Sequence, residues 1–275
     1  MSTGTPPPPW SPGRKHWKVT TAIAIGAVCV GAGSTGAAVY TAMKDQKPPT
    51  VRAIIEPPAV SNVPSVPSPP TAQDTMCSQK QGDKVAGWGP DRPLFKGNDS
   101  DWPALNSIQE NPQLGDERAF YGIRESGSKD LWKHSITVER GKTYTIRVYV
   151  DNNAKQLNLA ARGVRLMVNL PTCTGLSIGS QALLKGENNF PREIWSGINL
   201  TAPDRFNLNF IEGSARVYGN SYGEEGRFID ETFFTSRGVL LGSDDLDGEL
   251  KPGYGNALYF TYQVRPQFAD KTQTS

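Results

Sequence analysis

The stretch KTYTIRVYV, residues 142–150, alternates strictly between two kinds of side chain. The residues of one face are Tyr144, Ile146, Val148 and Val150, and those of the other are Thr143, Thr145, Arg147 and Tyr149. A period of two is typical of a β-strand with one buried face. ERGK at 139–142 joins this stretch to HSITVE, so residues 134–150 are predicted to form a hairpin.

The remainder of the folded part repeats short strands separated by turn residues. In GVRLMVNLP, residues 163–171, the side chains expected to point inward are Val164, Leu166, Val168 and Leu170. Further strands are predicted at 119–124, 194–200, 206–211, 214–218, 237–241 and 257–264. Short strands with frequent turns and no long amphipathic helix predict an all-β fold, an antiparallel immunoglobulin-like β-sandwich.

An uncharged apolar stretch, VTTAIAIGAVCVGAGSTGAAVYTAM at 19–43, precedes the folded part. As a helix it would be about 37 Å long, enough to cross a bilayer core of about 30 Å. Arg14, Lys15 and Lys18 stand before it and are expected to stay cytoplasmic. The sequence therefore predicts a single transmembrane helix with the N-terminus inside. The alternative is a cleaved signal peptide, since the stretch is rich in Ala and Gly. Both interpretations export the rest of the chain.

These observations divide the chain into five parts. They are a disordered basic tail (1–18), the membrane helix or signal peptide (19–43), a Pro-rich linker (44–81), the extracytoplasmic β-sandwich (82–268) and a disordered tail (269–275). Proline recurs in the linker without a packing pattern, which is typical of a semi-rigid spacer. Residues 82–118 are expected to wrap irregularly over the sandwich, with four apolar anchors: Trp88, Phe95, Trp102 and Leu105.

The charge distribution and the absence of known motifs exclude several function classes. Residues 1–18 carry a charge of +3, and the remainder holds 26 basic and 27 acidic residues. A balanced domain has no broad electrostatic footprint for nucleic acid, so nucleic acid is excluded as the main partner. The chain has no phosphate-binding or dinucleotide-binding glycine motif, no HExxH and no nucleophile elbow. We therefore predict that the protein needs no cofactor and is not an enzyme.

Several segments together resemble an uncharacterised extracytoplasmic domain of actinobacteria and other bacteria. They are NSIQENPQLGDERAFYGIRE, LWKHSITVERGKTYTIRVYVDNNA and RGVRLMVNLP. The closing part, LNFIEGSARVYGN and GVLLGSDDLDGELKPGYGNALYFTYQVR, is similar to the immunoglobulin-like repeat of unknown function in bacterial surface proteins. The turn Glu212-Gly213-Ser214 lacks the proline of that repeat. The resemblance covers about residues 85–266 and implies an all-β domain that faces the cell wall, with no catalytic residues to transfer.

Residues suited to catalysis are sparse. His134 is the one histidine beyond the N-terminal tail, and it is expected to be structural or solvent-exposed. A carboxylate-dependent hydrolase remains an alternative, because acidic residues are plentiful. The adjacent pairs Asp116–Glu117 and Glu224–Glu225 are interpreted as solvated charge, since neighbours on a strand point to opposite faces.

Three other groups of residues are candidate sites. A calcium loop would use Asp244, Asp245, Asp247 and Glu249, although Asp and Gly are also common in tight turns and we do not expect calcium to bind. Cys77 and Cys173 lie on the exported side, where disulfides persist, and are predicted to pair unless Cys77 belongs to a flexible linker. The candidate ligand contacts are aromatic residues in or beside turns: Tyr218, Tyr222 and Tyr254.

The function predicted from these features is that of a membrane-anchored, extracytoplasmic binding or structural module of the bacterial cell envelope. Its partners would be the membrane, through one helix, and a cell-wall glycan or an envelope protein. A secreted glycan-binding or adhesive module, released by signal-peptide cleavage, is the alternative.

Overall fold

The computed structural model describes residues 76–80 and 86–269, and this part of the chain is all-β. Twelve strands form one sheet, in which every strand pair except β4–β8 is antiparallel. The strands are β1 (Cys77–Ser78), β2 (Gly87–Gly89), β3 (Tyr121–Glu125), β4 (Ser135–Thr137), β5 (Tyr144–Val150), β6 (Arg165–Asn169), β7 (Gly175–Lys185), β8 (Glu193–Phe210), β9 (Arg216–Tyr218), β10 (Arg227–Phe228), β11 (Val239–Leu240) and β12 (Leu258–Phe268). The 3₁₀ turns are η1 (Glu117–Ala119), η2 (Glu231–Phe234) and η3 (Tyr254–Asn256).

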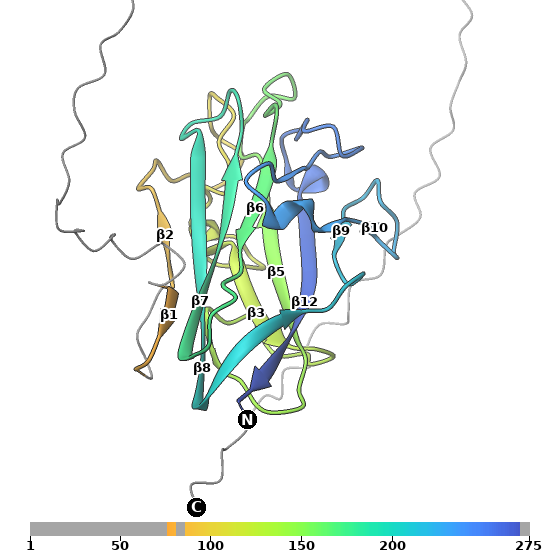
Figure 1. The fold of residues 1–275 in the computed structure, drawn as a ribbon. Coiled ribbons are helices and arrows are strands. Elements are labelled where there is room, and N and C mark those ends of the chain that lie inside the picture. Colours follow the sequence, from red (N-terminus) through yellow and green to blue (C-terminus); the bar gives the residue numbers. More distant parts are fainter. Residues whose placement is uncertain (1–75, 81–85, 270–275) are drawn as a thin grey trace, which may run out of the picture. The chain divides into compact units, whose positions relative to one another are not determined.

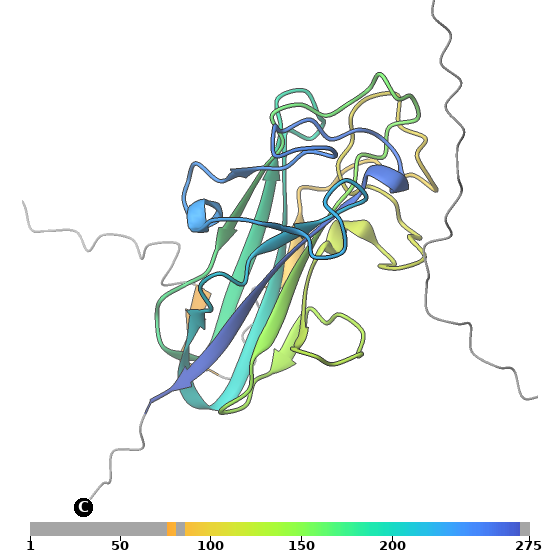
Figure 2. The ribbon, with the colours of Figure 1, turned by 90° about the vertical axis from the view of Figure 1, so that its right-hand side faces the viewer.

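The sheet folds over so that two groups of strands face each other, as Figure 1 and Figure 2 show. One group has the order β11–β6–β7–β8 and the other the order β3–β5–β12–β9–β10. The groups are connected because the last five residues of β8 pair with the last five of β12. Between them, the hydroxyl of Tyr121 on β3 lies 2.8 Å from that of Ser180 on β7. The hydrophobic core fills this interior.

The alternation in the first quoted stretch is confirmed on its apolar side. The residues of β5 that are fully buried in the core are Tyr144, Ile146, Val148 and Val150. On the other face Tyr149 is also buried, because residues 106–116 fold back over it and Asn111 contacts its hydroxyl. In the second stretch Val164, Leu166 and Val168 point inward, whereas Leu170 is only partly buried.

The predicted hairpin at 134–150 is wrong. Strand β4 runs parallel to β8, with hydrogen bonds from the Asn199 amide to the His134 carbonyl (2.9 Å) and from the Val138 amide to the Thr201 carbonyl (2.8 Å). Both edges of β5 are already occupied, by β3 and by β12. A three-residue strand cannot displace either partner, because each of them pairs along five or more residues.

Strands β7 and β8 differ from the sequence prediction. Residues 175–185 were not predicted as a strand, because much of their buried face is Gly, Ser and Ala rather than large apolar side chains. The strands predicted at 194–200 and 206–211 belong to one strand, β8. Its pairing with β7 is irregular between Thr201 and Phe206, where four residues of β8 oppose one of β7. Such a bulge accommodates Pro203 inside a long strand.

The segment before β3 is mostly irregular, as predicted, and is held to the end of β5 by side-chain hydrogen bonds. The amide of Asn106 donates to the Tyr149 carbonyl (2.8 Å), and its oxygen accepts from the Asp151 amide (3.0 Å). Of the four predicted anchors only Leu105 is fully buried. Trp88 and Phe95 are half-buried, and Trp102 is exposed at the edge of the Phe95 ring.

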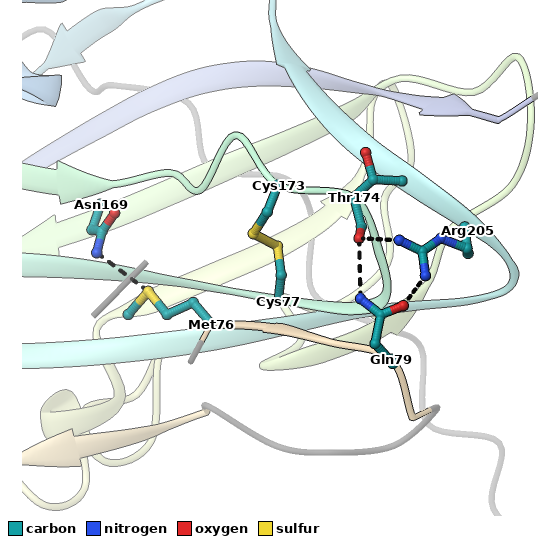
Figure 3. The surroundings of a disulfide bond; sticks show 7 residues. All are labelled: Met76, Cys77, Gln79, Asn169, Cys173, Thr174 and Arg205. Atoms are coloured by element: carbon teal, nitrogen blue, oxygen red, sulfur yellow. Dashed lines mark hydrogen bonds between the residues drawn. A yellow bond between two sulfur atoms is a disulfide. The ribbon is translucent and has the colours of Figure 1, made fainter. Parts of the chain in front are cut away.

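A disulfide joins Cys77 on β1 to Cys173 in the connection between β6 and β7 (Figure 3). Strand β1 also pairs with β7, so both the disulfide and the backbone hydrogen bonds between these strands hold β1 in place. Beside them the Thr174 carbonyl accepts hydrogen bonds from Gln79 (3.4 Å) and Arg205 (3.0 Å). The start of the domain is thereby fixed to the strand group that contains β7 and β8.

The predicted membrane helix or signal peptide (19–43), the tails at 1–18 and 270–275, and most of the linker lie outside the described residues. Within 76–80 and 86–269, the structure contains no helix of the length and apolar character that a bilayer crossing requires.

Candidate functional site

The outer face of the strand group β3–β5–β12–β9–β10 gathers arginine and aromatic side chains in rows. Residues paired directly across neighbouring strands point to the same face. One row contains Arg147 on β5, Thr261 on β12, Arg216 on β9 and Phe228 on β10. A second row contains three tyrosines: Tyr149, Tyr259 and Tyr218. A third contains Arg124, Thr145 and Gln263. We call these three rows, together with Trp132, the arginine–aromatic face.

Trp132 comes from the loop between β3 and β4 and lies over this face. The guanidinium carbons of Arg124 and Arg147 are 4.3 Å and 4.4 Å from its ring centroid. Glycine at position 122 makes the approach possible, because a Cβ there would lie 3.1 Å from the Trp132 Cβ. The Arg147 guanidinium is also 5.4 Å from the ring centroid of Tyr259. Cation–π contacts of this kind contribute about 0.5–2 kcal/mol each, so they hold the cluster together.

Arg147 is a half-buried cation that has no acidic partner in the part of the chain that the structure describes. Its Nε is buried and has no hydrogen-bond partner among the described residues. Burial lowers its pKa to about 10, and the positive charge of Arg124 acts in the same direction. The guanidinium therefore remains charged at neutral pH in a place where its charge is poorly solvated.

The arginine–aromatic face as a whole is positively charged. Its three rows contain Arg124, Arg147 and Arg216 and no Asp or Glu. Within residues 76–80 and 86–269, none of these three arginines forms an ion pair. An anionic ligand would meet favourable electrostatics here, and the aromatic rings offer apolar contact area.

Three of the four carboxylates in the acidic loop that was considered for calcium, those of Asp244, Asp245 and Asp247, are bound to other groups. Asp244 pairs with Lys251, and Asp245 pairs with Arg227. Asp247 accepts a hydrogen bond from the Glu249 amide (2.9 Å) within the turn. In the described part of the chain, no three His, Cys, Asp or Glu side chains are grouped so as to hold a metal ion. The loop thus has the hydrogen bonding of a tight turn.

The three tyrosines predicted as ligand contacts have different surroundings. Tyr218 belongs to the arginine–aromatic face and is half-buried. Tyr222 is held against its own loop, because its hydroxyl donates to the Gly242 carbonyl (2.6 Å), and burial raises its pKa to about 12. Tyr254 is 49% exposed in η3. The structure therefore places one of the three on a face that is suited to binding.

The interpretation of Glu117 as a solvated charge is wrong, because its side chain is fully buried. Its Oε2 accepts from the Ile108 amide (3.1 Å), and its Oε1 accepts from the Asn111 side chain (2.7 Å). The other carboxyl of this buried network is Asp151, which accepts from the Tyr149 hydroxyl (3.2 Å). Asp116, the sequence neighbour, instead pairs with Arg118 at the protein surface.

The pKa values of both buried carboxyls are raised. Burial, and the nearby charge of Asp151, raise the pKa of Glu117 to about 7. Burial raises the pKa of Asp151 to about 6. Raised carboxyl pKa values occur at catalytic sites, but they also occur in structural networks. Neither carboxyl is exposed, so a bulky substrate cannot reach them, and the network instead joins residues 106–117 to the end of β5.

The remaining catalytic candidates have structural contacts or stand alone. His134 is exposed, and its Nδ1 lies 2.8 Å from the Tyr121 carbonyl, so this nitrogen donates a hydrogen bond to the backbone. Glu224 and Glu225 are both exposed in the turn between β9 and β10.

Comparison with known proteins finds no matching family model, no matching curated protein and no matching solved structure. The resemblance to bacterial surface domains therefore stays a prediction from the quoted segments. Sequence reasoning did not find the arginine–aromatic face. Its only local signal was the polar side of β5, with Arg147 and Tyr149 two residues apart.

Proposed function

We propose that the protein is a non-catalytic binding module of the bacterial cell envelope, which presents the arginine–aromatic face to a ligand outside the cytoplasm. The observation that carries this proposal is the cluster of Trp132 with Arg124 and Arg147. Exposed protein surfaces rarely hold a half-buried cation without an acidic partner, since such a charge is costly to desolvate. A ligand that binds at this cluster would supply the partner that Arg147 lacks.

The extracytoplasmic location is supported by the disulfide between Cys77 and Cys173. Disulfides persist in oxidising compartments and are rare in the cytosol. The uncharged stretch at 19–43 and the Pro-rich linker at 44–81 agree with a domain mounted on a membrane anchor. The two facing strand groups support the finer assignment of an immunoglobulin-like β-sandwich.

A released, secreted module is the alternative, and a fractionation experiment separates the two. We expect the C-terminally tagged protein to run at full length and to resist alkaline extraction from membranes, because residues 19–43 would span the bilayer. A mature N-terminus near residue 39 would assign the protein to the secreted class instead.

The carboxylate-dependent hydrolase is disfavoured by the burial of its best pair. Glu117 and Asp151 are both fully buried under residues of the domain itself. A glycosidase places its two carboxyls on either side of an accessible sugar bond. The arginine–aromatic face, in contrast, lies on the outside of the sheet, where a polymer can reach it.

Co-sedimentation of the purified full-length chain with the organism's own cell-wall fragments tests the proposal. We expect saturable binding that does not depend on Ca²⁺ and that weakens by about tenfold in Trp132→Ala, given the usual strength of cation–π contacts. Trp88→Ala is the matched control, because Trp88 is also half-buried and lies under a guanidinium, that of Arg118 at 3.8 Å, outside the arginine–aromatic face. Absence of saturable binding, or equal loss in both variants, would contradict the proposal.

A further inference from the structure

We infer that the ligand of the arginine–aromatic face is an anionic polysaccharide, whose carboxylate or phosphate groups are bound by Arg124 and Arg147. This inference rests on the proposed binding function and specifies its ligand. The recognition element is a pair of guanidinium groups that lie within 4.3 Å and 4.4 Å of one indole ring.

The first argument is the unsatisfied state of Arg147. Arg92, a buried arginine whose Nε also has no acceptor, still donates from its two Nη atoms to the carbonyls of Pro90 (3.2 Å) and Asn106 (2.9 Å). Arg118 forms an ion pair with Asp116. Among the described residues Arg147 has neither kind of contact: no carbonyl accepts from its guanidinium, its Nε included, and no acidic residue pairs with it. A guanidinium presents a planar fork of donors that matches a carboxylate or phosphate, so an anionic group would complete its hydrogen bonding.

The second argument is the like charge of Arg124 beside it. Arg124 and Arg147 occupy diagonal positions on neighbouring strands, because Arg124 pairs with Thr145 in the register of β3 and β5. Two cations over one ring repel each other, and this repulsion is larger in a partly desolvated place than in water. An anion bound to both guanidiniums would remove the repulsion. The tryptophan orients both guanidiniums without neutralising either.

The third argument concerns the length of the ligand. Arg216 lies in the same row as Arg147, two strands away, which corresponds to about 10 Å at the usual strand spacing. Thr261 lies between them and provides a hydroxyl. A spacing of this size suits a chain that repeats its charge at about the length of a disaccharide, rather than a single small anion. Tyr218 and Tyr259 line the neighbouring row with rings and hydroxyls, which suit sugar faces and sugar hydroxyls.

The composition of the face favours a glycan over a lipid surface. Membrane insertion needs a contiguous apolar area, whereas this face alternates arginines and tyrosines with Thr145, Thr261 and Gln263. Single-stranded nucleic acid also combines negative charge with stacking, so it is included among the outcomes of the test.

The test measures binding of the full-length chain to polygalacturonate, a carboxylate polymer, and to its fully methyl-esterified form, which is uncharged. Phosphomannan provides a phosphate polymer, and single-stranded DNA provides the nucleic-acid arm. We expect binding to at least one of the two charged polysaccharides, at least tenfold weaker binding to the ester, and loss of affinity as salt increases. Binding should weaken by tenfold or more in Arg147→Gln and in Arg124→Gln.

Two further variants test whether the effect comes only from the loss of a positive charge at the surface. Arg140→Gln removes the same charge from an exposed arginine that stacks on Phe268 at 4.9 Å, outside the arginine–aromatic face, and should leave affinity unchanged. Arg147→Lys retains the charge but lacks the planar fork, so its affinity should be intermediate. Thermal denaturation of each variant checks that it is folded, and Arg124→Gln serves alone if Arg147→Gln does not fold.

The outcomes separate this inference from the proposed function. Equal affinity for the acid and the ester, or unchanged affinity in both arginine variants, would overturn the inference. If cell-wall sedimentation then still depended on Trp132, the binding function would stand with a different ligand. DNA binding as tight as polysaccharide binding, lost in the same variants, would overturn the assignment to a glycan.

Discussion

Replacing Glu117 by Gln should change how the stability of the domain depends on pH. In the folded protein burial raises the pKa of Glu117 to about 7, against 4.5 for an unperturbed glutamate. A raised carboxyl pKa means that the folded state holds its proton over a range where the unfolded state has released it. Its contribution to stability is therefore fully present below about pH 4.5 and is lost as pH rises through about 7.

The size of the effect follows from the difference between the two pKa values, which corresponds to about 3 kcal/mol lost between about pH 4 and about pH 8. Glutamine cannot ionise, so this loss is absent from the variant. The amide oxygen of Gln can still accept from the Asn111 side chain, as Glu117 Oε1 does at 2.7 Å. Its NH₂ group, however, would face the Ile108 amide, which now donates to Oε2, and losing that bond costs about 1 kcal/mol at every pH.

The stability curves of the two proteins should therefore cross. Below about pH 5 the variant should be less stable by about 1 kcal/mol, and near pH 8 it should be more stable by about 2 kcal/mol. Urea unfolding followed by tryptophan fluorescence, repeated at one-unit pH steps, measures both curves. Glu224→Gln is the control, because Glu224 is exposed, and its curve should follow that of the wild type. Parallel curves for Glu117→Gln and wild type would refute the reasoning.

Three other substitutions or additions have expected outcomes. Replacing both Cys77 and Cys173 by Ser should lower the free energy of unfolding by about 4.7 kcal/mol in the chain-entropy model, since 96 residues separate the bridged positions; an unchanged urea midpoint would contradict this. Phe233→Ala should cost about 3–5 kcal/mol, because the ring is fully buried, whereas Phe190→Ala, at a ring that is 60% exposed, should cost far less in the same urea titration. Calcium should not raise the melting temperature, because Asp244 and Asp245 are already paired with Lys251 and Arg227; a rise that disappears in Asp245→Ala would show the opposite.

The core faces of single strands were predictable, because they depend on a local period of two. Tyr144, Ile146 and Val148 point inward as the alternation predicts. The partners of each strand were not predictable from local pattern: β5 pairs with β12, which begins more than a hundred residues later, instead of with the adjacent segment at 134–138. Which strands pair depends on how all the strands of the sheet compete for the available edges, and a local pattern does not contain that information.

The candidate site was missed for the same reason. Arg147 and Arg216 lie in one row only through the register of three strands, and Trp132 reaches Arg147 from a loop. Glu117 likewise is buried in a hydrogen-bond network that includes Asp151, which is remote in sequence. Its neighbour Asp116 therefore gave no indication of this burial. Local spacing carries no information on contacts that arise between separate elements.

The position of β12 has a consequence for the order in which the domain acquires its structure. This last strand of the described domain pairs with β5, β8 and β9, and its partner positions Leu258 and Val150 are far apart along the chain. If the domain is exported as we propose, the chain emerges from a translocation channel N-terminal end first and cannot close the interior until residues 258–268 have passed through. Contacts so remote in sequence form slowly, and the exposed edges of β5 and β8 invite aggregation in the meantime. Maturation of this domain is thus tied to the release of its C-terminal strand, and chains truncated before that strand should be cleared by proteases.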